Sequence, residues 1–281
     1  YVGVLSFDNL KEHLHFSSTL PDSIPYRTSY YNRMWGFCLS KRSYDNLDKH
    51  SFYKMDIDSE FVDGLINIGE LCISGRSQKE IIFTSYLCHP EQAHDGLSGV
   101  VCLLDLYDKL KDRDNFYTYR FFFIPETIGS ICLLARGVIE PPKVEFGIVS
   151  TCVGYGKSLT YKETFLGNHP IDIVVRNRDK TTNQKFTPTG SDERQLSSPK
   201  IRIPTASIMT EPHSEFPEYH TSADNLDLVN METIRRVIFL SDGSNSPLEM
   251  SVQTGIPVKE IEKCVKVLLE KNIIRKFTCD K

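Results

Sequence analysis

The residues with the clearest chemical potential lie in the segment TSYLCHPEQAHDGLSG, residues 84–99. A β-rich run over 80–88 ends at His89, and Asp95 follows shortly before a helix expected to begin near Ser98. Ligands of open parallel sheets bind beyond the carboxyl ends of the strands, so both side chains are expected there. Zn²⁺ takes histidine nitrogen and aspartate oxygen as ligands. The segment therefore predicts a metal site, while a helix cap by Asp95 beside a loop histidine is the plainer alternative.

A second strand end carries a carboxylate. The sequence IPETIGS places Glu126 after a buried apolar strand over 117–125 and ahead of a helix that opens with Thr127. Glu126 is expected to act as a general base over a metal-activated water. The dipole of the helix N-terminus would also stabilise a carboxylate here without any catalytic role. Ligand-type residues at two adjacent strand ends favour the catalytic interpretation.

A third group lies later in the chain, in EYHTSADNLD, residues 218–227. His220 is a further candidate metal ligand. Asp224 could cap the following helix or orient the loop that holds His220, and the sequence leaves both open. Upstream, TGSDERQ carries Asp192 and Glu193, two carboxylates that could meet a substrate α-amine.

The elements that must position these residues alternate along the middle of the chain. Continuous apolar runs are typical of strands buried on both faces, and apolar residues every three or four positions indicate helices. The expected strands are 80–88, 117–125, 144–154 and 201–209, and the expected helices are 98–112, 127–137 and 225–240. This alternation predicts an α/β fold with a mostly parallel central sheet and helices on both faces.

Two stretches depart from this alternation. Residues 26–75 are rich in aromatic residues and glycine turns and lack helical periodicity, which predicts a small inserted antiparallel β domain. Residues 242–281 follow the order helix, glycine turn, helix and short strand, which is that of a winged helix. The predicted division is an α/β domain from 1–25 and 76–241, the inserted β domain, and a winged-helix-like domain.

Composition limits the class of protein. The chain has 281 residues, of which 40% are hydrophobic and 25% charged, and its formal net charge is −4. These values are typical of a globular protein, and the mild acidity argues against binding nucleic acid through bulk charge. No apolar run approaches the ~18 residues of a membrane span, and the first residues do not resemble a secretory signal. The 8 cysteines lack zinc-finger or disulfide-framework spacing, so we expect a cytoplasmic protein with reduced thiols.

The combination of motifs resembles a known family. Their order resembles that of the zinc aminopeptidases with a phosphorylase-like α/β sheet, a family that also holds the glutaminyl cyclases. More closely, the chain is similar to an aminopeptidase-like subgroup often found near polysaccharide-biosynthesis genes, with an inserted β domain and a C-terminal winged helix. The matching motifs are CHP, GLSG, PETIGS, GSDERQ and YHTSADN, and the resemblance covers nearly the whole chain.

The resemblance implies a role for each motif residue. His89 resembles the first metal histidine, Asp95 the carboxylate that bridges two zinc ions, and His220 the last metal histidine. Glu126 resembles the general base. Members with two ions have Glu-Glu where this chain has Glu126-Thr127, and an aspartate at the end of the next strand that FGIVSTCVGYG lacks. Three protein ligands suit one catalytic zinc, so one ion is favoured over two.

Further differences from the motifs of the subgroup affect whether a second ion could bind. The Ser-His of the subgroup is Ser85-Tyr86 here, and the Asn-Asp-Asn of the subgroup begins with His94. His94 could supply one more ligand, and Asp192 or Glu193 another. The missing ligands also leave open a degenerate site without activity.

The predicted function is that of a zinc-dependent, aminopeptidase-like hydrolase acting on a small peptide or amide substrate. Glu126 would take a proton from the attacking water and return it to the leaving amine. Tyr155 would steady the oxyanion, and Asp192 and Glu193 would bind the substrate. The alternative is a non-catalytic aminopeptidase-like protein in a polysaccharide-biosynthesis pathway. A homo-oligomer is left open, and the nearly balanced charges of the second tail helix argue against DNA as a partner.

Overall fold

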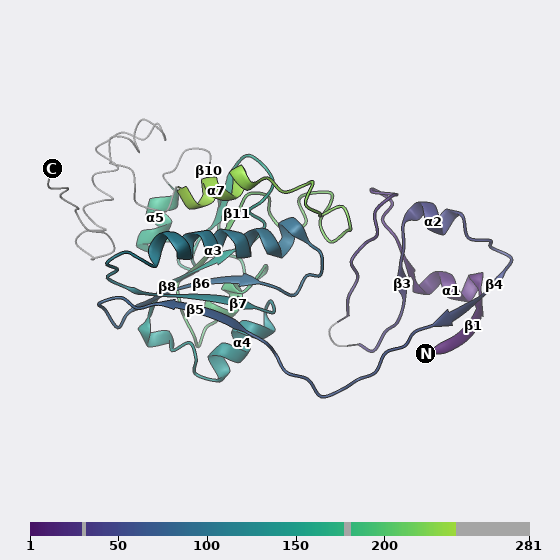
Figure 1. Cartoon of the computed structure of the whole chain (residues 1–281), viewed down its shortest axis with the longest axis horizontal. Helices are drawn as coiled ribbons and strands as arrows, with labels where there is room; N and C mark the ends of the chain where they lie inside the picture. Colours follow the sequence, from purple (N-terminus) through teal and green to yellow (C-terminus); the bar gives the residue numbers. More distant parts are fainter. Residues whose placement is uncertain (30–31, 177–180, 240–281) are drawn as a thin grey trace.

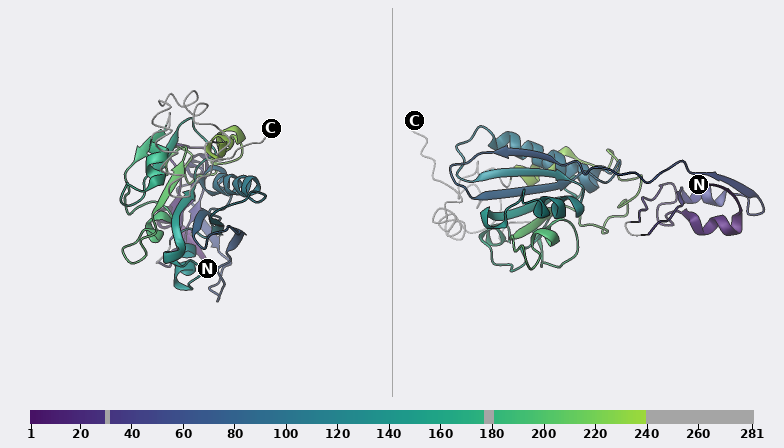
Figure 2. Two further views of the ribbon diagram at one scale, coloured as in Figure 1. Left: turned by 90° about the vertical axis from the view of Figure 1, so that its left-hand side faces the viewer. Right: turned by 90° about the horizontal axis from the view of Figure 1, so that it is seen from below.

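The computed structural model describes residues 1–29, 32–176 and 181–239. These residues form a sheet domain and a smaller N-terminal unit, which are joined by the irregular segment 57–68 (Figure 1). The right-hand view in Figure 2 shows the same two parts side by side along the long axis of the molecule. The winged helix predicted for 242–281 lies outside the described residues.

Seven strands form the central sheet, in the order β10-β9-β11-β8-β6-β7-β5. They are β5 (Gly69–Ile73), β6 (Glu80–Tyr86), β7 (Thr118–Ile124), β8 (Val144–Ser150), β9 (Leu159–Lys162), β10 (Thr181–Gln184) and β11 (Thr205–Met209). The pairs β6/β7, β6/β8, β8/β11 and β9/β10 are parallel, whereas β5/β7 and β9/β11 are antiparallel. The predicted α/β fold with a mostly parallel sheet is confirmed.

Helices cover both faces of this sheet, with α3 and α7 side by side on one face and α4 on the other (Figure 1). The helices are α3 (Ser98–Leu110), α4 (Ile128–Ala135), α5 (Pro170–Arg176), α6 (Glu193–Leu196) and α7 (Met231–Phe239). A π-helical turn, η2 (Ala93–Leu97), leads into α3, and a 3₁₀ turn, η3 (Pro141–Lys143), leads into β8. The strands therefore lie between two helical layers.

The core explains why the inner strands are continuously apolar. Successive side chains of a strand point to opposite faces of the sheet. Ile81 and Phe83 of β6 pack with Leu103 of α3, whereas Ile82 packs on the other face with Leu133 of α4. Each fully buried side chain of this size contributes about 1.5–3 kcal/mol through the hydrophobic effect. Strand β6 is thus held from both sides, and the loop after it begins from a fixed point.

Helix α3 lies very close to the sheet at Gly99. A Cβ atom there would lie 2.2 Å from the carbonyl oxygen of Ser150 and 2.5 Å from the hydroxyl of Ser85. Only a glycine allows this spacing without displacing the backbone of β8. The close contact fixes the start of α3 against the carboxyl ends of β6 and β8.

The N-terminal unit is built from short elements. They are β1 (Val2–Ser6), α1 (Phe7–Leu10), the 3₁₀ turn η1 (Lys11–His13), β2 (Leu14–His15), β3 (Phe37–Cys38), α2 (Lys41–Asp45) and β4 (Phe52–Asp56). Strand β1 pairs antiparallel with β4, and β2 pairs parallel with β3. Residues 1–15 therefore pair inside this unit.

This pairing differs from the boundaries expected from sequence in two places. The sequence places residues 1–25 in the α/β domain, yet β1 pairs with β4 of the predicted insertion. Residues 26–75 were expected to form the insertion, yet β5 pairs with β7 at the edge of the central sheet. Both pairings join segments distant in the chain, and a local pattern of side chains carries no signal for the partner of a strand. The division into domains as such stays a prediction.

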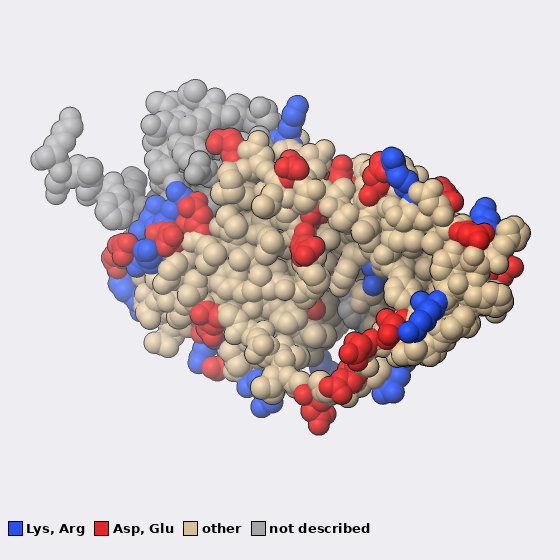
Figure 3. All heavy atoms as spheres, turned by 45° about the vertical axis from the view of Figure 1, so that its right-hand side comes forward, with Lys and Arg blue, Asp and Glu red and all other residues tan. Residues whose placement is uncertain are grey.

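The charges on the surface and the cysteines of the described residues point to no particular class of partner. On the face shown in Figure 3, basic and acidic side chains are scattered around a largely uncharged centre. Among the described residues, no helix is both long and apolar enough to cross a membrane. The described cysteines are free thiols, so disulfides do not hold this part of the chain together.

Candidate metal centre

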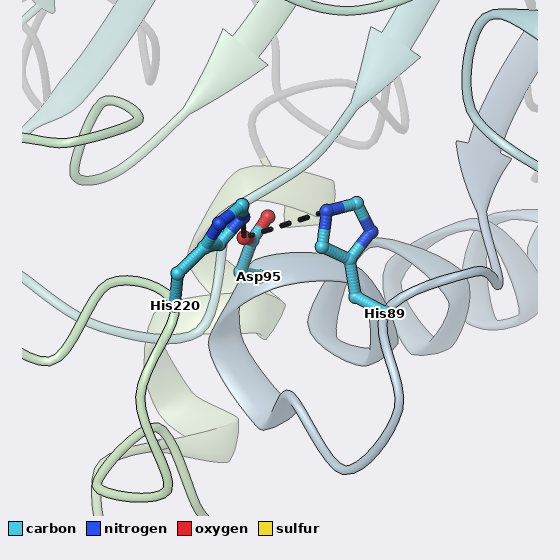
Figure 4. A group of neighbouring side chains, drawn as sticks. All are labelled: His89, Asp95 and His220. Atoms are coloured by element: carbon cyan, nitrogen blue, oxygen red, sulfur yellow. Dashed lines mark ion pairs between the residues drawn. The ribbon is translucent and has the colours of Figure 1, made fainter. Parts of the chain in front are cut away.

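Three side chains predicted as metal ligands converge beyond the carboxyl end of β6. His89 follows that strand, Asp95 lies in η2, and His220 lies in the loop before α7 (Figure 4). Asp95 Oδ2 is 3.0 Å from His220 Nε2 and 4.0 Å from His89 Nε2. The Asp95 side chain is 1% exposed and that of His89 6%, whereas His220 keeps 29% of its side chain open to solvent. The group is therefore buried but accessible from one side.

The nearest pair of atoms in this group forms an ion pair but no hydrogen bond. Asp95 Oδ2 and His220 Nε2 are buried, and neither has a hydrogen-bond partner among the described residues. A buried polar atom without a partner costs about 1–3 kcal/mol. Together with His89, each offers one ligand atom within 4.8 Å of the others. Two imidazole nitrogens and a carboxylate oxygen facing one space are a donor set that suits Zn²⁺.

The turn that carries Asp95 has an unusual backbone. Within η2, Asp95 has φ −84° and ψ 82°, and Gly96 has φ 123° and ψ −73°. A positive φ of this size favours glycine, and a Cβ at Gly96 would also lie 3.3 Å from the Tyr86 ring. The sharp turn lets the Asp95 carboxylate lie over the end of β6, toward His89.

Asp224 ties this turn to the loop of His220. The carboxylate of Asp224 accepts the backbone N–H of His94 at 2.6 Å and that of Asp95 at 2.9 Å. Its backbone carbonyl also accepts the N–H of Ala93 at 3.1 Å. Burial raises the pKa of Asp224, while these N–H groups oppose the shift. Since α7 begins only at Met231, Asp224 orients the loop and does not cap the helix.

The loop of His220 also contacts the N-terminal unit. His220 has φ 52°, and its ring stacks on Tyr219 with 3.9 Å between the ring centroids. The carbonyl of His220 accepts the backbone N–H of Tyr26 at 2.6 Å. The Tyr26 ring lies 5.3 Å from the His220 ring and 5.9 Å from the His89 ring. One wall of the site is therefore supplied by a residue far from the motifs.

The charges of the group suit metal ligation. Burial by itself would raise the pKa of Asp95, but the nearby imidazoles of His220 and His89 and the hydroxyl of Tyr86 outweigh it and lower the pKa to about 2. Burial lowers the pKa of His89, although Asp95 opposes the shift. Near neutral pH, Asp95 is a carboxylate and His89 is a neutral imidazole. These are the protonation states that bind cations.

Glu126 stands at the end of β7 and is the predicted general base. Burial raises its pKa to about 7, the hydroxyl of Ser191 opposes the shift, and the charges of Asp192 and Asp95 add to it. Its backbone N–H donates to the Cys88 sulfur at 3.2 Å. A carboxyl with a pKa near the working pH is suited to proton transfer in both directions.

In each of the two predicted substrate-binding carboxylates, one of the two oxygens is bonded to neighbouring residues. Asp192 Oδ1 accepts the N–H of Thr127 at 2.9 Å and the hydroxyl of Ser130 at 2.6 Å, at the start of α4. Glu193 pairs with the Lys162 ammonium at 2.8 Å. The other oxygens, Asp192 Oδ2 and Glu193 Oε2, are buried without a hydrogen-bond partner among the described residues. The geometry leaves these oxygens for a ligand, and the substrate role stays a prediction.

Tyr155 and His94 belong to an aromatic group. The Tyr155 ring lies 5.9 Å from His94 and 6.5 Å from Phe216, and its oxyanion role stays a prediction. His94 Nδ1 accepts the N–H of Gly154 at 3.1 Å, and burial lowers the pKa of His94 to about 4. Among the described residues, His94 is in neither group of converging ligand atoms.

Sequence reasoning missed a second group of potential ligands. Asp95, Cys152 and His213 also bring one ligand atom each to within 4.8 Å of one another. Cys152 follows an apolar strand, where a thiol is usually a core residue, and His213 stands in a loop without a recognisable motif. The sequence gives one indication of this group: residues 146–156, FGIVSTCVGYG, lack the aspartate that members with two ions are expected to carry there.

The sheet and the ligand-type residues at its strand ends define a protein with an aminopeptidase-like α/β fold. A crystal structure of a candidate peptidase from Clostridium acetobutylicum is similar, with a TM-score of 0.82 and 32% identity over 98% of this chain and 75% of that one. The chain belongs to the family described as Domain of unknown function (DUF4910), whose model matches residues 15–242.

More distant structures share the fold alone. The zinc aminopeptidase of Bacillus subtilis gives a TM-score of 0.51 at 19% identity, over 62% of this chain and 47% of that one. The glutaminyl cyclase of Porphyromonas gingivalis gives 0.52 at 14% identity, over 63% and 76%. The predicted resemblance to zinc aminopeptidases and glutaminyl cyclases is therefore confirmed at the level of the fold.

One curated relative is 40% identical over 233 residues, which are 81% of this chain and 53% of the relative. This Clostridium acetobutylicum protein carries the provisional name polysaccharide biosynthesis protein with aminopeptidase-like domain. The present chain spans about half the length of that relative.

Proposed function

We propose that the chain is a zinc-dependent, aminopeptidase-like hydrolase that holds one ion and cleaves a peptide or amide bond in a small substrate. One observation carries the proposal. Asp95 Oδ2 and His220 Nε2 lie 3.0 Å apart and buried, without a hydrogen-bond partner among the described residues, and they face His89. A shared cation satisfies all three groups at once.

The roles follow from the positions of the side chains. His89, Asp95 and His220 would hold the zinc ion, which would supply an activated water and a Lewis acid for the scissile carbonyl. Glu126 accepts the proton of the attacking water and donates it to the leaving nitrogen, which its raised pKa favours.

The substrate contacts are assigned to the remaining predicted residues. The unpartnered oxygens of Asp192 and Glu193 accept hydrogen bonds from the substrate amine. The exposed edge of Tyr155 offers its hydroxyl to the developing oxyanion. These contacts give the substrate one orientation in the site.

A second candidate function is a non-catalytic role in polysaccharide biosynthesis. The name of the curated relative favours it, and so does Thr127, which stands where two-zinc aminopeptidases carry a glutamate. In this case the fold and the histidines remain, but turnover is lost. We also propose a cytoplasmic location, supported by the free thiols of the described cysteines.

Metal analysis and hydrolysis of aminoacyl reporters test both functions together. The protein as purified should hold one zinc, and a chelator should remove the zinc and the hydrolysis together. Glu126→Gln should keep the zinc and lose hydrolysis by a factor of about 10²–10⁴. His220→Ala should lose both, whereas His50→Ala, at an exposed position, should lose neither.

Each outcome decides between the two functions. Zinc without hydrolysis in the wild-type protein favours the non-catalytic role. Full activity of Glu126→Gln would remove the proposed mechanism, and unchanged metal content of His220→Ala would remove the proposed site.

A further inference from the structure

The hydroxyl of Tyr86 contacts two members of the second group of potential ligands, Asp95 and His213. Tyr86 is fully buried at the end of β6, and its hydroxyl donates to Asp95 Oδ1. The same oxygen lies 2.5 Å from Thr151 Oγ1 and 3.4 Å from His213 Nε2. The Cys152 thiol also donates to Asp95 Oδ1, at 3.6 Å. The phenol oxygen thus contacts Asp95 and His213 of this group, and the third member, Cys152, contacts the same Asp95 oxygen.

The two oxygens of Asp95 therefore have different partners. Oδ2 faces His89 and His220 and has no hydrogen-bond partner among the described residues. Oδ1 is saturated by Tyr86 and Cys152. A carboxylate that bridges two ions needs both oxygens free, and here only one is.

We propose that the Tyr86 hydroxyl takes the place of a second cation, so that the site holds one ion and Asp95 is oriented toward it. The inference rests on the proposed metal site formed by His89, Asp95 and His220. Tyr86 is in this view a positioning residue, which acts on the ion through Asp95.

Metal–ligand distances also indicate that the Tyr86 hydroxyl and a second ion would compete for the same space. Zinc lies about 2.0–2.3 Å from nitrogen, oxygen and sulfur ligands. An ion at that distance from Asp95 Oδ1 would compete for the same oxygen with the Tyr86 hydroxyl, which donates to it and lies 3.4 Å from His213 Nε2. The phenol and a second ion therefore exclude each other.

The phenol is also held in place. The Tyr86 ring has no exposed surface, and the missing side chain of Gly96 leaves room for it, since a Cβ there would lie 3.3 Å from the ring. Partners that orient a metal ligand typically change metal affinity by 10–100-fold when they are removed. The Tyr86 hydroxyl should therefore strengthen binding of the first ion while it excludes a second.

Two substitutions separate these effects. Tyr86→Phe removes the hydrogen bond to Asp95 but keeps the ring, so that the space of the second ion stays filled. Tyr86→His replaces the phenol with a shorter imidazole, whose Nε2 ends short of the hydroxyl position by about the length of a zinc–nitrogen bond, ~2 Å. The first change should weaken zinc binding, and the second should open the second site.

The experiment measures zinc stoichiometry and affinity by calorimetry and metal analysis, with circular dichroism to check the fold. Wild type should bind one Zn²⁺ per chain, and Tyr86→Phe one Zn²⁺ about 10–100-fold more weakly. Tyr86→His should bind two, and the second should be lost again in the double variant Tyr86→His/Cys152→Ser. With Co²⁺ as probe, Tyr86→His should add a thiolate-to-metal absorption band that the double variant lacks.

The outcomes separate this inference from the proposed function. A wild-type protein that binds no zinc removes the proposed function. A wild type that binds two ions, or a folded Tyr86→His that binds one, overturns the role of Tyr86 and leaves the first site intact. If Tyr86→His does not fold, an unchanged zinc affinity of Tyr86→Phe overturns the inference.

Discussion

Asp224 Oδ2 accepts a hydrogen bond from the backbone N–H of Asp95 at 2.9 Å, although the two residues lie 129 positions apart in the chain. Asp224 follows His220 in the same loop, so this bond joins the segments of two candidate ligands. The position of one candidate ligand is therefore set by a carboxylate that itself would touch no ion.

Asp224→Ala should lower both stability and zinc affinity. It leaves the buried N–H groups of His94 and Asp95 without their acceptor, which costs about 1–3 kcal/mol for each group. We expect the free energy of unfolding in urea to fall by about 3 kcal/mol and zinc affinity to fall at least tenfold. Asp227→Ala changes an exposed carboxylate of the same loop and should alter neither. An equal loss in both variants would contradict the bridging role.

The contrast between Asp224 and the strands shows what the sequence could predict. The strand positions follow from local signals, because a strand buried on both faces must be apolar at every position, as Ile81, Ile82 and Phe83 are. The candidate ligands His89 and Asp95 were found because strand ends and helix starts are also local signals.

Other parts depend on distant partners and left no such signal. Asp224 could have been a helix cap, since caps and long-range acceptors use the same residue types. Tyr86 ends an apolar strand and resembles a core aromatic, and nothing nearby indicates that its hydroxyl meets Asp95. The pairing of Val2–Ser6 with Phe52–Asp56 is equally non-local. Sequence patterns predicted the sheet and the candidate ligands that it brings together, but not the contacts that orient them.

Gly99→Ala should destabilise the sheet domain near the site. The new methyl group would lie 2.2 Å from the Ser150 carbonyl oxygen, so α3 and β8 must move apart. Overpacking of this kind typically costs about 1–3 kcal/mol, measured as the free energy of unfolding. Gly64→Ala serves as the control, because a Cβ there meets no atom within 4 Å, and it should change stability by no more than about 0.5 kcal/mol. Equal stability of the two variants would show that α3 has room to shift.

Tyr26→Ala should change which substrates are cleaved without changing metal binding. The Tyr26 ring lies beside both His220 and His89, yet its only hydrogen bond to that loop is from its backbone N–H, which alanine retains. We expect kcat/KM for bulky aminoacyl reporters to rise relative to small ones, with zinc affinity within twofold of wild type. Tyr26→Phe keeps the ring and should keep the wild-type preference. An unchanged preference in Tyr26→Ala would place this wall outside the substrate path.

Glu126→Gln should make the metal-free protein more stable at high pH. Burial raises the pKa of Glu126 from 4.5 to about 7, so the folded state holds a proton that the unfolded state releases between these values. The stabilisation due to this proton is complete below pH 4.5 and is lost as the pH rises through about 7.

A glutamine side chain does not ionise, so Glu126→Gln loses no stability as the pH rises. After treatment with a chelator, the variant should therefore exceed wild type by up to about 3 kcal/mol at pH 8, a value set by the shift from 4.5 to about 7. The difference should close toward pH 4. Urea unfolding at pH 4, 6 and 8 measures it, with Glu215→Gln, at an exposed position, expected to follow wild type throughout. A difference between Glu126→Gln and wild type that does not change with pH would mean that the carboxyl of Glu126 is solvated in the folded protein.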